Sequence, residues 1–223
     1  MTMLLAVDTS TSFVGLALYD GDRVLGEMSW TTKQHHTAEL PPALSGLLSR
    51  CGAAMASVNA LGVAVGPGSF TSLRVGLSLV KGIALARNLP VMGISTLDII
   101  AAAQPPARRP LIAAIQAGRT RIAFGEYKSL GKQWQAQGPA RSGTVDELLG
   151  EIESPTLIAG EFASDERKKI SKSRKMNLAS PALCVRRPAV LAELAWERWH
   201  KGDVDDAASL APIYLHVAGT PIE

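Results

Sequence analysis

The sequence predicts an α/β protein made of two similar lobes, and three observations carry this prediction. Short apolar runs of strand length alternate with longer segments of helical periodicity. The order of these segments in the first half recurs about 105 residues later in the second half. Between the halves, residues 104–110 read Gln-Pro-Pro-Ala-Arg-Arg-Pro, and the prolines oppose both helix and strand. We therefore expect one lobe over residues 1–103 and another over residues 104–223.

The first half opens with three apolar runs that are separated by short polar turns, a pattern typical of antiparallel strands. These runs cover residues 3–7, 13–19 and 23–30. A helix is predicted next, because leucines at positions 40, 44, 47 and 48 follow a candidate cap at Thr37. A buried strand, a long helix, another strand and a short helix follow, at residues 60–65, 69–88, 90–94 and 96–103.

The second half repeats this order. Strands are predicted at residues 111–116, 120–127 and 132–137, and a helix, a strand and a helix at residues 145–152, 156–159 and 162–171. A final helix covers residues 188–201. Two copies of β-β-β-α-β-α are the plan of actin-like ATPases and sugar kinases. We predict this duplicated actin-like (ASKHA) fold with RNase H-like lobes.

Composition limits the class of protein. The chain has 223 residues, of which 47% are hydrophobic and 19% charged, so it can bury a substantial core. No apolar run reaches the roughly 18 residues of a membrane span, and the start of the chain lacks the features of a signal peptide. Cys51 and Cys184 lie far apart, which argues against a disulfide framework. We expect a cytoplasmic protein without a membrane contact.

Two polar turns could carry chemistry. The first strand runs directly into Asp8-Thr9-Ser10. At this turn, nucleotide enzymes of the same plan place an acid that binds the metal and hydroxyls that contact phosphate. The alternative is that these residues only cap a hairpin turn. The run Gly66-Pro67-Gly68-Ser69 can cap a helix and present N–H groups to an anion. The residues that we assign to a vestigial phosphate site are Asp8, Thr9, Ser10, Gly66, Gly68 and Ser69.

Several features argue against an active enzyme. No lysine follows Gly66–Thr71 at the spacing of a phosphate-binding loop, and the mirrored turn of the second half has Gln116 in place of an acid. His35 and Glu39 would share a helix face, but no second histidine follows four residues on, so we expect no metal site. No GxSxG nucleophile elbow is present. We therefore assign no catalytic residues.

The two long helices of the first half carry few charges, as a helix does when it is covered on two sides. A partner protein could cover them, or the rest of this chain could. The residues that we expect at a partner interface are His36, Leu40, Leu44, Phe70, Leu73, Arg74, Gly76, Leu77 and Val80. Residues 167–175 form a basic cluster that could contact RNA phosphates, or could be a solvated helix end.

Taken together, the sequence motifs of the chain resemble those of the TsaB (YeaZ) family, the small subunit of the bacterial machinery that makes threonylcarbamoyladenosine in tRNA. The family's Gly-Pro-Gly-Ser-Phe-Thr-Gly-Leu-Arg-Ile-Gly matches residues 66–76 except at Ser72 and Val75. Looser matches are the Asp-Thr-Ser turn, residues 36–42 and residues 212–216. Gln116 departs from the acid that is usual in the second lobe, so no role is taken from that turn.

The resemblance implies a non-catalytic dimerisation or scaffold subunit with no cofactor of its own. Its partners would be a larger TsaD-type transferase, which carries ATP and metal, and a TsaE-type ATPase. It would pair through the first lobe's helices, form a homodimer when alone, and meet tRNA only through the complex. The alternative is a small actin-fold kinase or ATPase that binds nucleotide and acts by itself.

Overall fold

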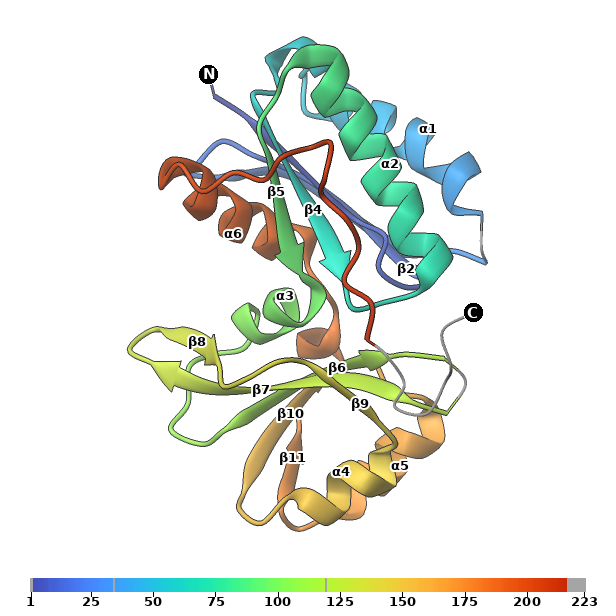
Figure 1. Cartoon of the computed structure of the whole chain (residues 1–223), viewed down its shortest axis with the longest axis vertical. Coiled ribbons are helices and arrows are strands. Elements are labelled where there is room, and N and C mark those ends of the chain that lie inside the picture. Colours follow the sequence, from blue (N-terminus) through green and yellow to red (C-terminus); the bar gives the residue numbers. More distant parts are fainter. Residues whose placement is uncertain (1, 34, 119, 216–223) are drawn as a thin grey trace.

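The computed structural model describes residues 2–33, 35–118 and 120–215 and consists of two lobes stacked along the long axis (Figure 1). Each lobe is built on one mixed sheet. The first sheet has the strand order β3-β2-β1-β4-β5, and the second has the order β11-β10-β6-β7-β8, with β9 paired to β7. Read from the other edge, the second order matches the first, so the predicted duplication is confirmed.

The first lobe follows the predicted order of elements. They are β1 (Leu4–Asp8), β2 (Phe13–Tyr19), β3 (Val24–Thr31), α1 (His36–Arg50), the 3-10 turn η1 (Met55–Ser57), β4 (Ala60–Gly66), α2 (Phe70–Arg87), β5 (Val91–Ser95) and α3 (Thr96–Ala102). The β1, β2 and β3 strands are antiparallel neighbours, whereas β4 runs parallel to both β1 and β5. Helix α1 begins at His36, so Thr37 lies inside the helix and is not its cap.

The second lobe repeats the topology with shorter elements. They are β6 (Leu111–Gln116), β7 (Ile122–Leu130), β8 (Gln133–Ala136), β9 (Arg141–Gly143), α4 (Val145–Glu151), β10 (Thr156–Gly160), α5 (Ser164–Lys172), β11 (Met176–Leu178) and η2 (Pro181–Cys184). The sequence did not predict β9 and β11, because three residues are too few to show an alternating pattern. Strand β11 pairs with β10 and takes the place that β5 has in the first lobe.

The last helix, α6 (Pro188–His200), returns to the first lobe (Figure 1). Its Leu191 and Ala195 pack into a core with Leu4 of β1. A Cβ on Gly62 would come within 2.7 Å of the Ala195 methyl group, so helix and sheet approach closely. The division of the chain at residues 103 and 104 stays a prediction; in space, α6 covers the first sheet.

The first sheet is therefore covered on both faces, by α1 and α2 on one side and by α6 on the other (Figure 1). Strands β1 and β4 are buried along their whole length, as expected for central strands between two helical layers. Among the residues that the structure describes, no helix is long and apolar enough to cross a membrane.

Candidate functional site

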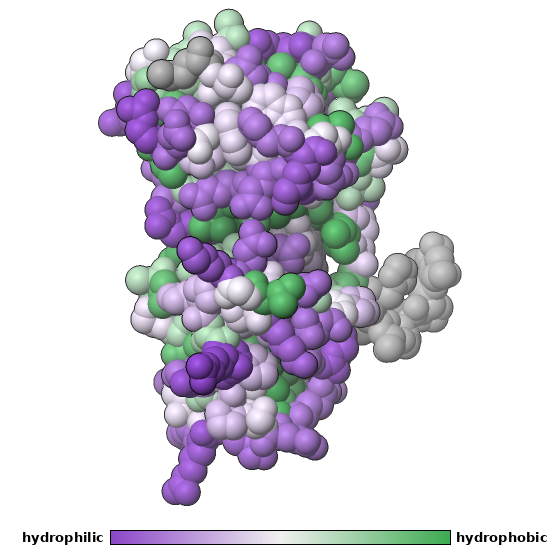
Figure 2. All heavy atoms as spheres, turned by 90° about the vertical axis from the view of Figure 1, so that its left-hand side faces the viewer, coloured by the Kyte–Doolittle hydropathy of each residue, from purple (hydrophilic) through white to green (hydrophobic). Residues whose placement is uncertain are grey.

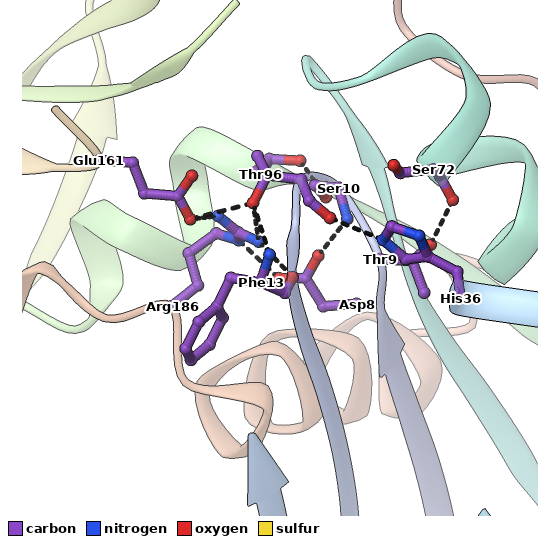
Figure 3. Close-up of polar contacts among 10 residues, drawn as sticks. Asp8, Thr9, Ser10, Phe13, His36, Ser72, Thr96, Glu161 and Arg186 are labelled. Carbon is purple, nitrogen blue, oxygen red and sulfur yellow. Dashed lines mark hydrogen bonds and ion pairs between the residues drawn. The ribbon is translucent and has the colours of Figure 1, made fainter. Parts of the chain in front are cut away.

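The turn after β1 lies at the junction of the lobes, and its polar groups are satisfied within the chain (Figure 3). Asp8, Thr9 and Ser10 are at most 1% exposed. The Thr9 hydroxyl donates to the Ser72 carbonyl at 2.7 Å and accepts from the Gly76 N–H at 3.1 Å. The Ser10 hydroxyl bonds the Thr96 hydroxyl at 2.8 Å. These hydroxyls therefore link the turn to α2 and α3 by hydrogen bonds and are not free to bind a phosphate.

The corner between β4 and α2 is locked onto the same turn by direct contact of the backbones. The Ser69 N–H donates to the Ser10 carbonyl at 2.7 Å, and a Cβ on Gly68 would come within 2.3 Å of that oxygen. A Cβ on Gly76 would come within 2.3 Å of the Thr9 hydroxyl oxygen. The Ser69 side chain caps α2 by accepting the Ser72 N–H. The glycines of residues 66–76 thus permit this close approach.

Arg186, between η2 and α6, fills the space beside Asp8 (Figure 3). Its Nε donates to Asp8 Oδ2 at 2.7 Å, and its two terminal nitrogens donate to Glu161, to the Thr11 hydroxyl and to the Phe13 carbonyl. The Arg186 side chain is fully buried. Asp8 belongs to the first lobe and Glu161 directly follows β10 of the second, so one guanidinium joins both lobes.

The electrostatics of this group follow from its burial. Burial acts to lower the pKa of Arg186, but the charges of Asp8 and Glu161 outweigh it and raise that pKa, so the guanidinium stays charged. A buried charge is tolerated only when it is paired and its hydrogen bonds are satisfied. Arg186 thus supplies beside Asp8 the positive charge that a divalent cation supplies in a nucleotide enzyme.

The other expected elements of a nucleotide site do not converge here. Gln116, at the end of β6, is partly exposed, and the Ala117 N–H bonds the Arg121 carbonyl to close that turn. Within the described residues, no three histidine, cysteine, aspartate or glutamate side chains come together to hold a metal ion. His36 is buried and its Nε2 donates to the Thr11 carbonyl at 2.9 Å, so it supports the same turn.

Most residues of the expected partner interface are buried within the fold of this chain. His36, Leu40, Leu44, Leu73, Leu77 and Val80 are at most 6% exposed, and Gly76 is buried as well. Of that set, Phe70 is 54% exposed and Arg74 lies over its ring, 3.5 Å from the centroid. The apolar stripe of α2 therefore faces the sheet, and the rest of this chain covers it. Of the expected interface residues, Phe70 and Arg74 are the two that the fold leaves exposed.

The outward faces of α1 and α2 are small and carry little charge. Residues exposed there include Pro41, Ser45, Ser78, Gly82 and Leu85. Gly82 has no atom within 4 Å of an added Cβ, and Leu85 is 64% exposed. Lys81 is turned toward the C-terminal segment, where its Nζ donates to the Ala208 and Leu210 carbonyls. The part of these helices around Ser45, Ser78 and Gly82 therefore exposes small, uncharged side chains.

A second contact joins the lobes on the side of α3. The Tyr127 hydroxyl of β7 donates to Asp98 Oδ1 of α3 at 2.7 Å, and the Trp134 indole of β8 donates to the Gln104 carbonyl at 3.0 Å. Asp98 and Tyr127 line a cavity of about 310 Å³ that Ile94 and Leu194 also line. Figure 2 shows this side of the molecule, with hydrophobic residues in the hollow between the lobes.

The basic cluster at residues 167–175 is partly neutralised. Lys168 pairs with Asp165 and Lys169 with Asp146, both on exposed surface, and Lys175 donates to the Ile152 carbonyl. Among the described residues, Lys172 and Arg174 form no ion pair. A contact with tRNA through this cluster stays a prediction.

Sequence reasoning missed the two residues that complete the junction, Arg186 and Glu161. Asp8 and Arg186 are 178 positions apart, so no local pattern joins them. One signal was present in the duplication: Gly160 ends β10 as Gly66 ends β4, and both have positive φ. The residue after Gly160 therefore lies at the junction as the residues after Gly66 do.

The comparisons with known proteins agree with this architecture. The family model described as TsaD, tRNA N6-adenosine threonylcarbamoyltransferase, matches residues 24–187. A Bacillus subtilis protein named tRNA threonylcarbamoyladenosine biosynthesis protein TsaB is 29% identical over 96% of this chain and 94% of its own length. The Escherichia coli protein of the same name is 32% identical over 56% of this chain and 54% of its own length.

A solved structure gives the same fold. The structure titled YeaZ from Pseudomonas aeruginosa superposes with a TM-score of 0.75 and covers 96% of this chain and 100% of its own, at 24% identity. The family model covers more than half of the chain. The chain therefore belongs to the family of the tRNA N6-adenosine threonylcarbamoyltransferase model and, within it, to the TsaB (YeaZ) proteins.

Proposed function

We propose that the chain is a non-catalytic subunit in the biosynthesis of threonylcarbamoyladenosine in tRNA, and that it supports a larger transferase of the TsaD type. The pairing of Asp8 with the buried Arg186 carries this proposal. A metal-dependent enzyme of this plan needs the carboxylate free to take a hard cation. Here the carboxylate is bound by a cation that belongs to the chain, and the relatives' names supply the pathway.

In this proposal ATP and metal bind to the larger partner, a TsaE-type ATPase joins the complex, and tRNA is reached only through that complex. The chain acts in the cytoplasm and forms a homodimer when the partner is absent. The outer face of α1 and α2 is the docking surface, because its small, weakly charged residues let helices of a partner approach closely.

Reconstitution tests the function. The chain alone is expected to modify no tRNA and to show no Mg-ATP binding by calorimetry, and adding the transferase subunit should produce threonylcarbamoyladenosine, measured by mass spectrometry of tRNA nucleosides. Tight Mg-ATP binding by the chain alone would overturn the scaffold role and favour an independent kinase or ATPase.

Two exposed leucines give a matched test of the docking surface. Leu85 on α2 is 64% exposed and Leu130 at the end of β7 is 70% exposed. Leu85→Glu should prevent coelution with the transferase subunit in size-exclusion chromatography, because it places a charge on the proposed face. Leu130→Glu should leave the complex intact. Equal behaviour of the two variants would move the docking surface away from α2.

A further inference from the structure

The two edges of the first sheet are treated differently by the chain. At the β5 edge, the Asp205 N–H donates to the Val91 carbonyl at 2.9 Å, and the Gly93 N–H donates to Asp205 Oδ2 at 2.7 Å. Arg198 donates to the Gly93 carbonyl at 2.7 Å. These outward backbone groups of β5 are therefore satisfied by Arg198 of α6 and by the segment that follows that helix.

The β3 edge has no such cover among the described residues. The strand order ends at β3, whose only strand partner is β2. The Thr32 N–H donates to the Ser12 carbonyl at 2.8 Å, and the register continues this alternation to Trp30↔Val14 and Met28↔Leu16. Because backbone groups alternate in direction along an antiparallel ladder, Glu27, Ser29 and Thr31 present their N–H and C=O groups to the open side.

A register shift at Leu25 interrupts the pairing near the start of β3, but residues 27–31 lack the other usual protections of an edge strand. Residues 24–31 contain no proline and no lysine, the residues that most often block pairing at an edge. Glu27 is the one charge in the strand, and it is engaged elsewhere: its carboxylate accepts from Arg187 and from the Ala189 N–H at the start of α6. The strand is therefore free to accept another strand.

Beside this edge lies a groove of about 760 Å³ between β3 and α1. Met28 and Trp30 line it from the strand, and Ala38, Pro42 and Ala43 line it from the helix. Its charged residues are both acids, Glu27 and Glu39. The Trp30 indole donates to Glu39 at 2.7 Å and lowers the pKa of that carboxyl, which stays ionised.

We propose that β3 is a docking edge for an extended, basic segment of another protein, which adds to the sheet as a further strand. The free backbone groups of Glu27, Ser29 and Thr31 supply the ladder bonds, and the walls of the groove take apolar side chains at alternate positions. Glu39 selects a lysine or arginine on the same face. A second copy of this chain fits less well, because its β3 would bring no cation to Glu39.

Fluorescence anisotropy tests the edge with labelled heptapeptides of alternating valine and threonine, carrying one lysine at each position in turn. At least one lysine position should give saturable binding. Ser29→Pro should weaken that binding by about tenfold or more, because it removes an outward N–H and adds a ring at the edge. Ser29→Ala keeps the N–H and should bind as the unaltered chain does.

The charge of the groove is tested separately. Glu39→Gln keeps an acceptor for the Trp30 indole but removes the charge, so it should weaken the lysine peptides by roughly two- to fivefold and reduce the salt dependence of binding. Hydrogen exchange of the unaltered chain provides a measurement without any variant, and peptide should protect the amides of residues 27–31.

Three results would overturn the proposal. The first is the absence of binding at every lysine position, and the second is binding that Ser29→Pro leaves unchanged. The third is a dimer of the chain alone, seen by light scattering, that Ser29→Pro dissociates, since the edge would then belong to a second copy.

Discussion

Two of the contacts between the lobes hold an acid of the first lobe, and the acid is balanced differently at each. Asp8 is buried and paired with the charged Arg186, which also binds Glu161 of the second lobe. Asp98 is held by the neutral Tyr127 hydroxyl, and desolvation raises the pKa of Asp98 although that hydrogen bond acts to lower it. The first contact is therefore a full charge pair, whereas the second places an acid in an environment that disfavours its ionised form.

The two contacts differ in what balances the acid. At the Asp8 contact, Arg186 of the same chain supplies the charge that balances the carboxylate. The Asp98 contact lies beside a cavity on the other side of α3 and needs no counterion. We expect the removal of one partner to cost most at the Asp8 contact, because it would leave a buried charge unpaired. Substitutions at each contact can test this ranking.

The largest effect is expected from Arg186→Met, which leaves Asp8 buried without its cation. Breaking a buried ion pair from one side costs about 3–5 kcal/mol of unfolding free energy. Urea denaturation measures the loss, and the added change Asp8→Asn should restore part of it by removing the uncompensated charge.

A matched control is Arg198→Met. Arg198 also binds two carboxylates, Asp203 and Asp205, but its side chain is 26% exposed. Solvent weakens such ion pairs, so Arg198→Met should lose clearly less unfolding free energy than Arg186→Met. Equal losses in Arg186→Met and Arg198→Met would contradict the view that the Asp8 contact is the stronger joint.

The next effect concerns the backbone contact that supports Asp8. Gly76→Ala would place a Cβ 2.3 Å from the Thr9 hydroxyl oxygen, and the overpacking should cost about 1–3 kcal/mol. Gly82→Ala on the same helix meets no atom within 4 Å and should raise stability by about 0.5–1 kcal/mol. Thermal denaturation of both variants gives the comparison, and a stable Gly76→Ala protein would show that the turn can move aside.

The sequence predicted the strands and helices well because their signals are local. The apolar runs of β1, β4 and β6 and the periodicity of α1 and α2 lie within a few turns of chain. It also predicted that α2 is covered. The sequence did not show what covers helix α2. In the structure the sheet and the segment that contains Ala208 and Leu210 cover this helix, whereas we expected Leu77 and Val80 to face a partner.

The junction was harder to predict for the same reason. A carboxylate that ends a strand has the same local sequence whether a metal or a guanidinium binds it. The partner of Asp8 comes from a segment just before α6, and its position depends on how the second lobe brings the chain back. Only the assembled fold carries that information, so the sequence indicated Asp8 and left its partner undetermined.

A smaller effect is expected at the second contact from Tyr127→Phe, which removes the donor to Asp98 and should cost about 0.5–1.5 kcal/mol. Because that donor stabilises the ionised acid, the loss should be larger at pH 7 than at pH 4. Tyr19→Phe removes a hydroxyl whose acceptor is the Gly21 carbonyl, so its loss should be the same at both pH values. Urea denaturation at each pH measures both.

The smallest effect is expected from Asp98→Asn, and its pH dependence carries the information. The amide oxygen can still accept from Tyr127, so the change should be below the ~0.5–1.5 kcal/mol of Tyr127→Phe. The folded pKa of Asp98 is raised above the unfolded value of 3.8, so ionisation costs stability as pH rises through the folded pKa. Between pH 4 and pH 7, the unfolding free energy of Asp98→Asn should therefore rise relative to that of the unaltered chain. If the relative stability of the variant rose as the pH fell instead, Asp98 would be a stabilised carboxylate, and the two contacts would then be alike.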